Sequence, residues 1–259
     1  MNLEKLKDIE AEFLSQYPSG FEDAKFFPTM KKFDPSKLEA FTKENLKKEN
    51  FSNPNLVVDT FFKIIQKSVL VSLFDKLKFR DMLESLTSYE KDMLSIELYE
   101  LLHGNQKNGF EGIVEFLSQY NLAKWTIISV LLYYNNRQKE YFIKPTTTKN
   151  VIKYFELENL VYKSTPSFEF YDSYKKVLNI MKSNVHKSLC PDNAAFTGFL
   201  RIGMEDWFMS ELYYEQFRKI CSQYYDFDYE SFEKFKDITF IKDVKKGEVL
   251  LDNYSKAKY

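Results

Sequence analysis

The chain has 259 residues, of which 44% are hydrophobic and 17% aromatic, and 37 basic against 38 acidic side chains leave a net charge of −1. So many aromatic residues exclude a disordered chain, and a balanced charge excludes a global basic field for nucleic acid or an anionic membrane. Only seven Gly and seven Pro residues are present, too few for the tight turns of an all-β fold, so we predict an all-α protein.

The residues that could hold a metal or form a disulfide are few and scattered. Cys190 and Cys221 form no close pair, and His103 lies far from His186. Zinc sites have closely spaced ligands, so we expect no metal, and we find no fingerprint of a cofactor. The N-terminus is acidic rather than signal-like, and no apolar run reaches the ~20 residues that cross a bilayer. These features predict a cytoplasmic protein with reduced thiols and no membrane partner.

The first fifty residues are predicted to pack on the core as an N-terminal region, 1–50. Apolar residues at helical spacing give a helix over Asn2–Tyr17, which Pro18 and Gly20 end. An irregular, aromatic-rich stretch follows, and a polar helix is expected over Ser36–Glu49.

The core domain, 51–235, opens with a long apolar segment. Leu56–Leu77 is apolar on nearly every side, so it is either one central helix or two helices with a bend near Lys67 and Ser68. A short helix to Leu86 follows, and the pair Thr87 and Glu90 is typical of a capping box. That cap starts a helix that we expect to run to His103 and to end at Gly104.

The centre of the chain reads as three helices. They are Phe110–Tyr120, a strongly apolar and therefore buried helix over Ala123–Tyr134, and Thr147–Phe155, which Pro145 opens. Further helices are expected over Phe168–Val185, Ala194–Ile202 and Ser210–Tyr225. The tail, 236–259, has two β-prone runs around Lys245-Lys246-Gly247, which indicate a β-hairpin, with a tail that forms no hairpin as the alternative.

The turn before the 147–155 helix is the best candidate for a binding site. Proline and threonine favour a helix start, where unpaired amides and a partial positive charge suit an anion. Threonine hydroxyls add donors and lysines add charge, so we predict a phosphate site formed by Lys144, Thr146, Thr147, Thr148, Lys149 and Lys153. The alternative is an ordinary capped helix with solvated lysines, because the glycine-rich backbone of a phosphate loop is absent.

These features give three hypotheses for function. The first is a helical module that binds a phosphate-bearing ligand, either nucleic acid or a phosphorylated small molecule. The second is a protein-interaction module without catalysis, which uses exposed aromatic side chains. The third is a hydrolase or lyase whose catalytic residues the sequence does not identify, so whether the protein is an enzyme stays open.

Several short segments have a distinctive sequence. They include YPSGFED, LAKWT, FIKPTTTKNVI and NAAFTGFL, at residues 17–23, 122–126, 142–152 and 193–200. These segments resemble a family of bacterial proteins to which no activity is attached. The resemblance implies that the Pro-Thr turn and the Asn193–Leu200 segment are shared features.

A second resemblance concerns layout alone. Residues 110–157 are similar in layout to the helix–hairpin–helix DNA glycosylases, with Asn121–Lys124 in the place of the hairpin. That hairpin would bind DNA phosphate through glycine amides, and the following helix would carry an aspartate near its start. Here the hairpin has no glycine and residues 144–148 contain no acid, so we transfer no catalytic residue.

Overall fold

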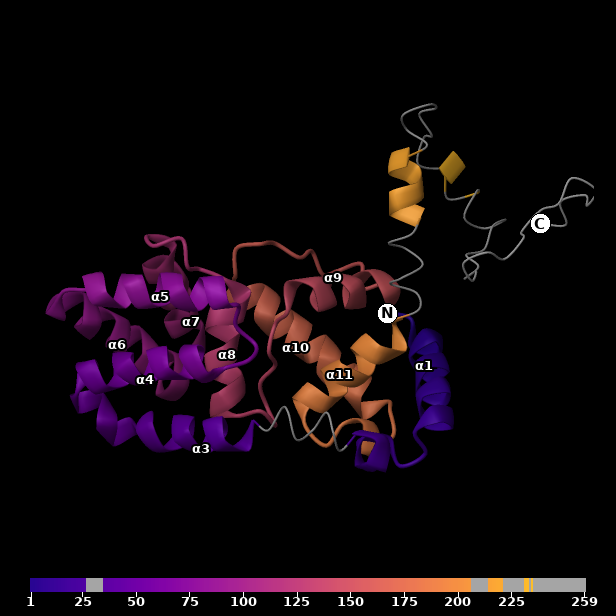
Figure 1. The fold of residues 1–259 in the computed structure, drawn as a ribbon, viewed down its shortest axis with the longest axis horizontal. Helices are drawn as coiled ribbons and strands as arrows, with labels where there is room; N and C mark the ends of the chain where they lie inside the picture. The colour runs from indigo at the N-terminus through magenta and orange to yellow at the C-terminus, as the bar shows by residue number, and fades with distance from the viewer. Residues whose placement is uncertain (27–34, 206–213, 221–230, 233, 235–259) are drawn as a thin grey trace, which may run out of the picture. The chain divides into compact units, whose positions relative to one another are not determined.

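The computed structural model describes residues 1–26, 35–205, 214–220, 231, 232 and 234. These residues form helices and connecting segments without a β-strand, which confirms the all-α prediction (Figure 1). The α-helices of the first unit are α1 (Leu3–Gln16), α3 (Ser36–Asn45), α4 (Pro54–Lys67), α5 (Leu73–Ser85), α6 (Ser88–His103), α7 (Gln106–Ser118), α8 (Trp125–Asn135), α9 (Pro145–Tyr154), α10 (Phe168–Ser183) and α11 (Asn193–Gly203).

Contacts divide the chain into two units, Met1–Gly203 and Met204–Tyr259, and the α-helices named above belong to the first. In the second unit, residues 214–220 are helical, inside the helix predicted over Ser210–Tyr225. The predicted hairpin around Lys245-Lys246-Gly247 lies outside the described residues. Among the described residues, no helix combines the length and apolar character that crossing a bilayer requires.

The apolar segment after residue 54 forms two helices, so the alternative with a bend at Lys67 and Ser68 is confirmed and the single helix is wrong. Ser68 leaves the helical conformation, with ψ at 130°. Its side chain is buried, lies 3.3 Å from the Tyr134 hydroxyl and accepts the amide of Leu70 at 3.1 Å. Ser72 then caps α5 by accepting the amide of Asp75. The buried Ser68 side chain thus binds the backbone just after the break, where α4 has ended.

Helix α8 is buried, as its apolar sequence predicted. Every residue from Ile127 to Tyr134 is buried, and α3, α4 and α7 pack against this helix. Figure 1 shows α9, α10 and α11 on the other side of α8, followed by α1, which packs on α11. Helix α1 of the N-terminal region is therefore attached to α11.

Helices α6 and α7 form the most extensively packed pair. The capping box of Thr87 and Glu90 is present, and Gly104 follows the last residue of α6. The next helix begins at Gln106 rather than Phe110, because the Asn105 side chain accepts the amide of Asn108 and starts it earlier. At Gly109 the two backbones nearly touch, since a Cβ there would lie 2.0 Å from the backbone nitrogen of Leu101.

The 3₁₀ turns are short and lie between these helices. They are η1 (Gly20–Glu22), η2 (Ala24–Phe26), η3 (Lys48–Ser52) and η4 (Lys187–Leu189). The helix predicted over Ser36–Glu49 therefore ends early, at Asn45, and η3 follows it. This η3 segment packs against α4 and α6 and forms one wall of a surface groove.

Candidate functional site

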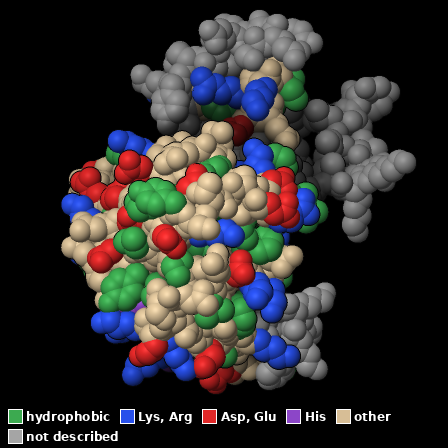
Figure 2. Space-filling model, turned by 90° about the vertical axis from the view of Figure 1, so that its left-hand side faces the viewer, with side chains coloured by type: hydrophobic (Ala, Val, Ile, Leu, Met, Phe, Trp, Pro, Cys, Tyr) green, Lys and Arg blue, Asp and Glu red, His purple; other side chains and the backbone are tan. Residues whose placement is uncertain are grey.

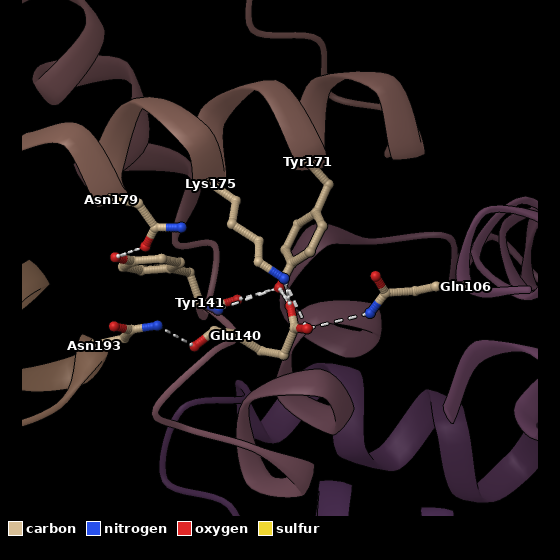
Figure 3. A network of polar contacts seen from close by, with 7 residues as sticks. All are labelled: Gln106, Glu140, Tyr141, Tyr171, Lys175, Asn179 and Asn193. Carbon is tan, nitrogen blue, oxygen red and sulfur yellow. Dashed lines mark hydrogen bonds and ion pairs between the residues drawn. The ribbon is translucent and has the colours of Figure 1, made fainter. Parts of the chain in front are cut away.

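A buried carboxylate holds the chain that leads into α9. Glu140 has only 9% of its surface exposed. Its carboxylate accepts from the Lys175 ammonium at 2.8 Å through both oxygens, from the Tyr171 hydroxyl at 2.9 Å and from the Gln106 amide at 3.3 Å. Figure 3 shows these groups converging from α10 and α7 on one carboxylate. Through these hydrogen bonds Glu140 anchors the segment that leads into α9.

The backbone of the segment 137–140 is also held by hydrogen bonds. Asn193 is buried, donates through its side-chain amide to the Glu140 carbonyl at 3.1 Å and donates its backbone amide to the Arg137 carbonyl at 3.2 Å. Its side-chain carbonyl oxygen accepts the Lys182 ammonium at 2.7 Å. The first residue of α11 therefore fastens the 137–140 segment (Figure 3), which gives a structural role to the start of the Asn193–Leu200 stretch.

Tyr141 and Tyr171 complete this network. The Tyr141 hydroxyl donates to Asn179 at 2.9 Å, and its backbone amide lies 3.2 Å from the Tyr171 hydroxyl. Burial, and then the adjacent Glu140 carboxylate, raise the pKa of Tyr171 well above its ordinary value. Tyr171 therefore stays protonated and acts as a hydrogen-bond donor to Glu140.

The start of α9 differs from most other helix starts in this protein. Its N-cap residue, Lys144, makes no side-chain cap. A side-chain oxygen accepts a first-turn amide at the starts of α1, α4, α5, α6, α7 and α10. In α9 the amide of Thr148 donates to the Lys144 carbonyl at 2.9 Å, whereas the amides of Thr146 and Thr147 have no acceptor within the described part of the chain.

The six residues of the predicted phosphate site divide between surface and interior. Lys144, Thr146, Lys149 and Lys153 are exposed, and Thr147 is half-buried. The Lys149 ammonium lies 5.2 Å from the centre of the Tyr162 ring.

Thr148 is the exception, because it is buried. Its hydroxyl lies by the phenol of Tyr174, whose pKa is raised by burial and lowered in part by this contact. Two of the three threonines therefore remain accessible to a ligand, and the third packs inward.

The turn between α7 and α8 occupies the place of the hairpin in the layout of the helix–hairpin–helix glycosylases. The amides of Asn121, Leu122 and Lys124 donate to the carbonyls of Ser118, Leu117 and Leu122 at 3.1, 2.9 and 2.7 Å. The Lys124 ammonium pairs with Asp75. These three amides therefore already serve the protein and are not available to a DNA phosphate.

A second surface combines exposed apolar side chains with a groove. The groove has a volume of ≈ 450 Å³ and lies between η3, the start of α4 and the outer side of α6. Phe51, Pro54, Ile96 and Tyr99 supply its apolar lining. Figure 2, which views the end of the unit built from α4, α5 and α6, shows hydrophobic side chains distributed among charged ones. The sequence prediction missed this surface because its walls come from two separate segments.

No family model, no curated protein and no solved structure matches this chain. Within the described residues, no group of three or more His, Cys, Asp or Glu side chains could hold a metal ion. The geometry of the α9 turn and of the α6 groove is therefore the basis for inferring function.

Proposed function

We propose that this protein binds a phosphate-bearing ligand at the first turn of α9. Nucleic acid and phosphorylated small molecules share the chemistry that such a turn recognises. The observation that carries the proposal is the uncapped helix start, where the amides of Thr146 and Thr147 have no acceptor among the described residues. Free first-turn amides and the positive end of the helix dipole both favour an anion.

Charge and aromatic surface near this turn support the same proposal. Lys144 directly precedes the turn, and Lys149 and Lys153 are exposed one and two turns further along. The Tyr162 ring lies beneath the Lys149 ammonium. A lysine beside an aromatic ring is suited to a phosphate next to a base, since bases stack on aromatic rings and phosphates attract ammonium groups.

Fluorescence anisotropy tests this proposal with a labelled single-stranded oligonucleotide, a labelled nucleoside triphosphate and unlabelled inorganic phosphate as competitor. We expect binding that weakens steeply with salt, and a loss of about tenfold or more on Lys149→Glu, because an attractive contact becomes repulsive. Lys63→Glu makes the same charge change on the exposed side of α4 and should leave the affinity nearly unchanged. Equal effects of the two variants, or no binding by any of the three probes, would overturn the proposal.

A second candidate function is protein interaction, and exposed apolar side chains on α5 and α6 favour it. Leu73 and Phe74 on α5 are 73% and 62% exposed, and Tyr89 and Ile96 on α6 are 72% and 54% exposed. Single exposed apolar residues are ordinary, but contiguous groups of them mark contact sites. The groove beside α6 makes that helix the more specific of the two surfaces.

A further inference from the structure

Helix α6 carries apolar side chains on two opposite faces. Its inner face, formed by Leu94, Leu98 and Leu101, is buried, and α4 and α7 pack against the helix. On its outer face Tyr89, Met93 and Ile96 are 72%, 37% and 54% exposed. A helix that is apolar on both sides is normally covered on both, so the outer face of α6 has the composition of a contact surface.

The groove beside this face has opposite charges at its two ends. At one end the Lys48 ammonium lies 5.8 Å from the centre of the Tyr99 ring, and at the other Asp92 borders the groove. Residues 92 and 99 are about two helical turns apart, or ~10 Å along the axis of α6. Neither Lys48 nor Asp92 forms an ion pair within the described residues. On α6, Ile96 lies between Asp92 and Tyr99 and lines the groove, so the groove has an apolar middle.

We propose that this face binds a second copy of the same chain, with the two α6 helices antiparallel about a two-fold axis at Ile96. A two-fold interface brings the same patch of both copies together, so the patch must be complementary to itself. Met93 and Tyr99 are each three residues from Ile96, so each methionine meets a tyrosine of the other copy, a favourable sulfur–aromatic contact. The same rotation brings Asp92 of each copy toward the Lys48–Tyr99 end of the other.

The composition of the whole chain is compatible with self-association. Its net charge is −1, and proteins of near-zero net charge associate more readily than strongly charged ones. This inference rests on the second candidate function, protein interaction, and is independent of the phosphate proposal at α9. It goes further by naming the partner and the residues at the centre of the contact.

Sedimentation velocity over a range of protein concentrations tests the inference on the full chain. We expect the mass to rise from 30.9 kDa toward twice that value. Ile96→Glu should raise the dimer dissociation constant at least tenfold, because the axis would bring two carboxylates face to face. Ile180→Glu changes an exposed apolar residue of α10 and should leave the constant unchanged. A monomer at every concentration, or equal responses to the two variants, would overturn the inference.

A charge exchange tests the orientation of the two copies. Lys48→Asp and Asp92→Lys should each weaken the dimer, since each places like charges at both ends of the contact. The double variant, Lys48→Asp with Asp92→Lys, restores opposite charges and should recover most of the lost affinity. Recovery supports the antiparallel arrangement, whereas additive losses in the double variant would contradict it.

Photo-cross-linking separates this inference from the function on which it rests. A photoreactive phenylalanine analogue in place of Tyr89 should give a product of twice the chain mass with purified protein. The same product should dominate when the protein is mixed with a cell extract. Products formed with other proteins alone would reject the second copy but keep protein interaction as a function. The absence of any product would reject both.

Discussion

The Glu140 network and the outer face of α6 both depart from the usual distribution of polar and apolar groups, but in opposite directions. Around Glu140 a charge is buried, and donors from α7 and α10 supply its hydrogen bonds. On α6, apolar side chains are exposed, and the described residues supply nothing to cover them. A buried charge and an exposed apolar group are each unfavourable unless something compensates for them.

The difference lies in where that compensation comes from. The buried charge of Glu140 is compensated by donors of the same chain, so the expected role of Glu140 is to fix the segment that leads to α9. The outer face of α6 has no such compensation among the described residues, so a partner from outside the chain is expected there. Changes at the first region should therefore alter stability, whereas changes at the second should alter association.

Lys175→Met is expected to have the largest effect, because it removes the ammonium that neutralises a buried carboxylate. Breaking such a pair on one side costs about 3 kcal/mol of unfolding free energy. Lys176→Met is the matched control one residue along the same helix. Its ion pair with Asp172 is largely exposed, so the loss should stay below about 0.5 kcal/mol. Urea denaturation of the two variants measures the difference.

Replacing both members of the Glu140–Lys175 ion pair sharpens this test. Glu140→Met combined with Lys175→Met replaces both charges by apolar groups and leaves no unpaired charge in the interior. The double variant should therefore be more stable than Lys175→Met alone. If the double variant loses as much unfolding free energy as the two single variants together, Lys175 is not what compensates the buried charge of Glu140.

Gly109→Ala examines the inner face of α6, which α7 covers at close range. A Cβ at this position would lie 2.0 Å from the Leu101 nitrogen, so the two helices must move apart at a cost of about 2 kcal/mol. At Gly112 a Cβ would instead meet the carboxylate end of Glu97, which can rotate away. Gly112→Ala also gains helix propensity of about 1 kcal/mol, so thermal unfolding should distinguish the two variants clearly.

Glu97→Gln should give the smallest effect, and its sign depends on pH. Burial, followed by the charges of Glu100 and Glu115, raises the pKa of Glu97 above its ordinary value of 4.5. A raised carboxyl pKa destabilises the native state while the group is ionised, so the glutamine variant should be more stable at pH 7 by a few tenths of a kcal/mol. The gain should fade as pH falls through the raised pKa and vanish below 4.5. A constant difference at all pH values would contradict this assignment.

Local signals in the sequence predicted the helices well. The capping box at Thr87, the apolar run of α8 and the proline that opens α9 all act over a few residues, and each is present. The residues at which the helices start and end were predicted less accurately. The sequence prediction started the helix after Gly104 at Phe110, but the Asn105 side chain caps α7 so that it begins at Gln106.

Long-range pairing could not be predicted from these local signals. Glu140 meets Lys175 and Tyr171 across more than thirty residues, and a single sequence does not show which charge partners which. The inward position of Thr148 has the same cause, since its neighbour Tyr174 comes from another helix. The apolar residues of α6 were visible in the sequence, but which of its faces is covered depends on where α4 and α7 pack.

Hydroxyl-radical footprinting of methionine oxidation tests the association at α6 most directly. Met93 is 37% exposed, Met1 is 47% exposed, and Met82 is buried, so one protein carries the probe and both controls. As protein concentration rises, we predict that Met93 oxidation slows while Met1 stays reactive and Met82 stays protected. If Met93 is oxidised equally fast at every concentration, no second copy covers α6 and the central claim is contradicted.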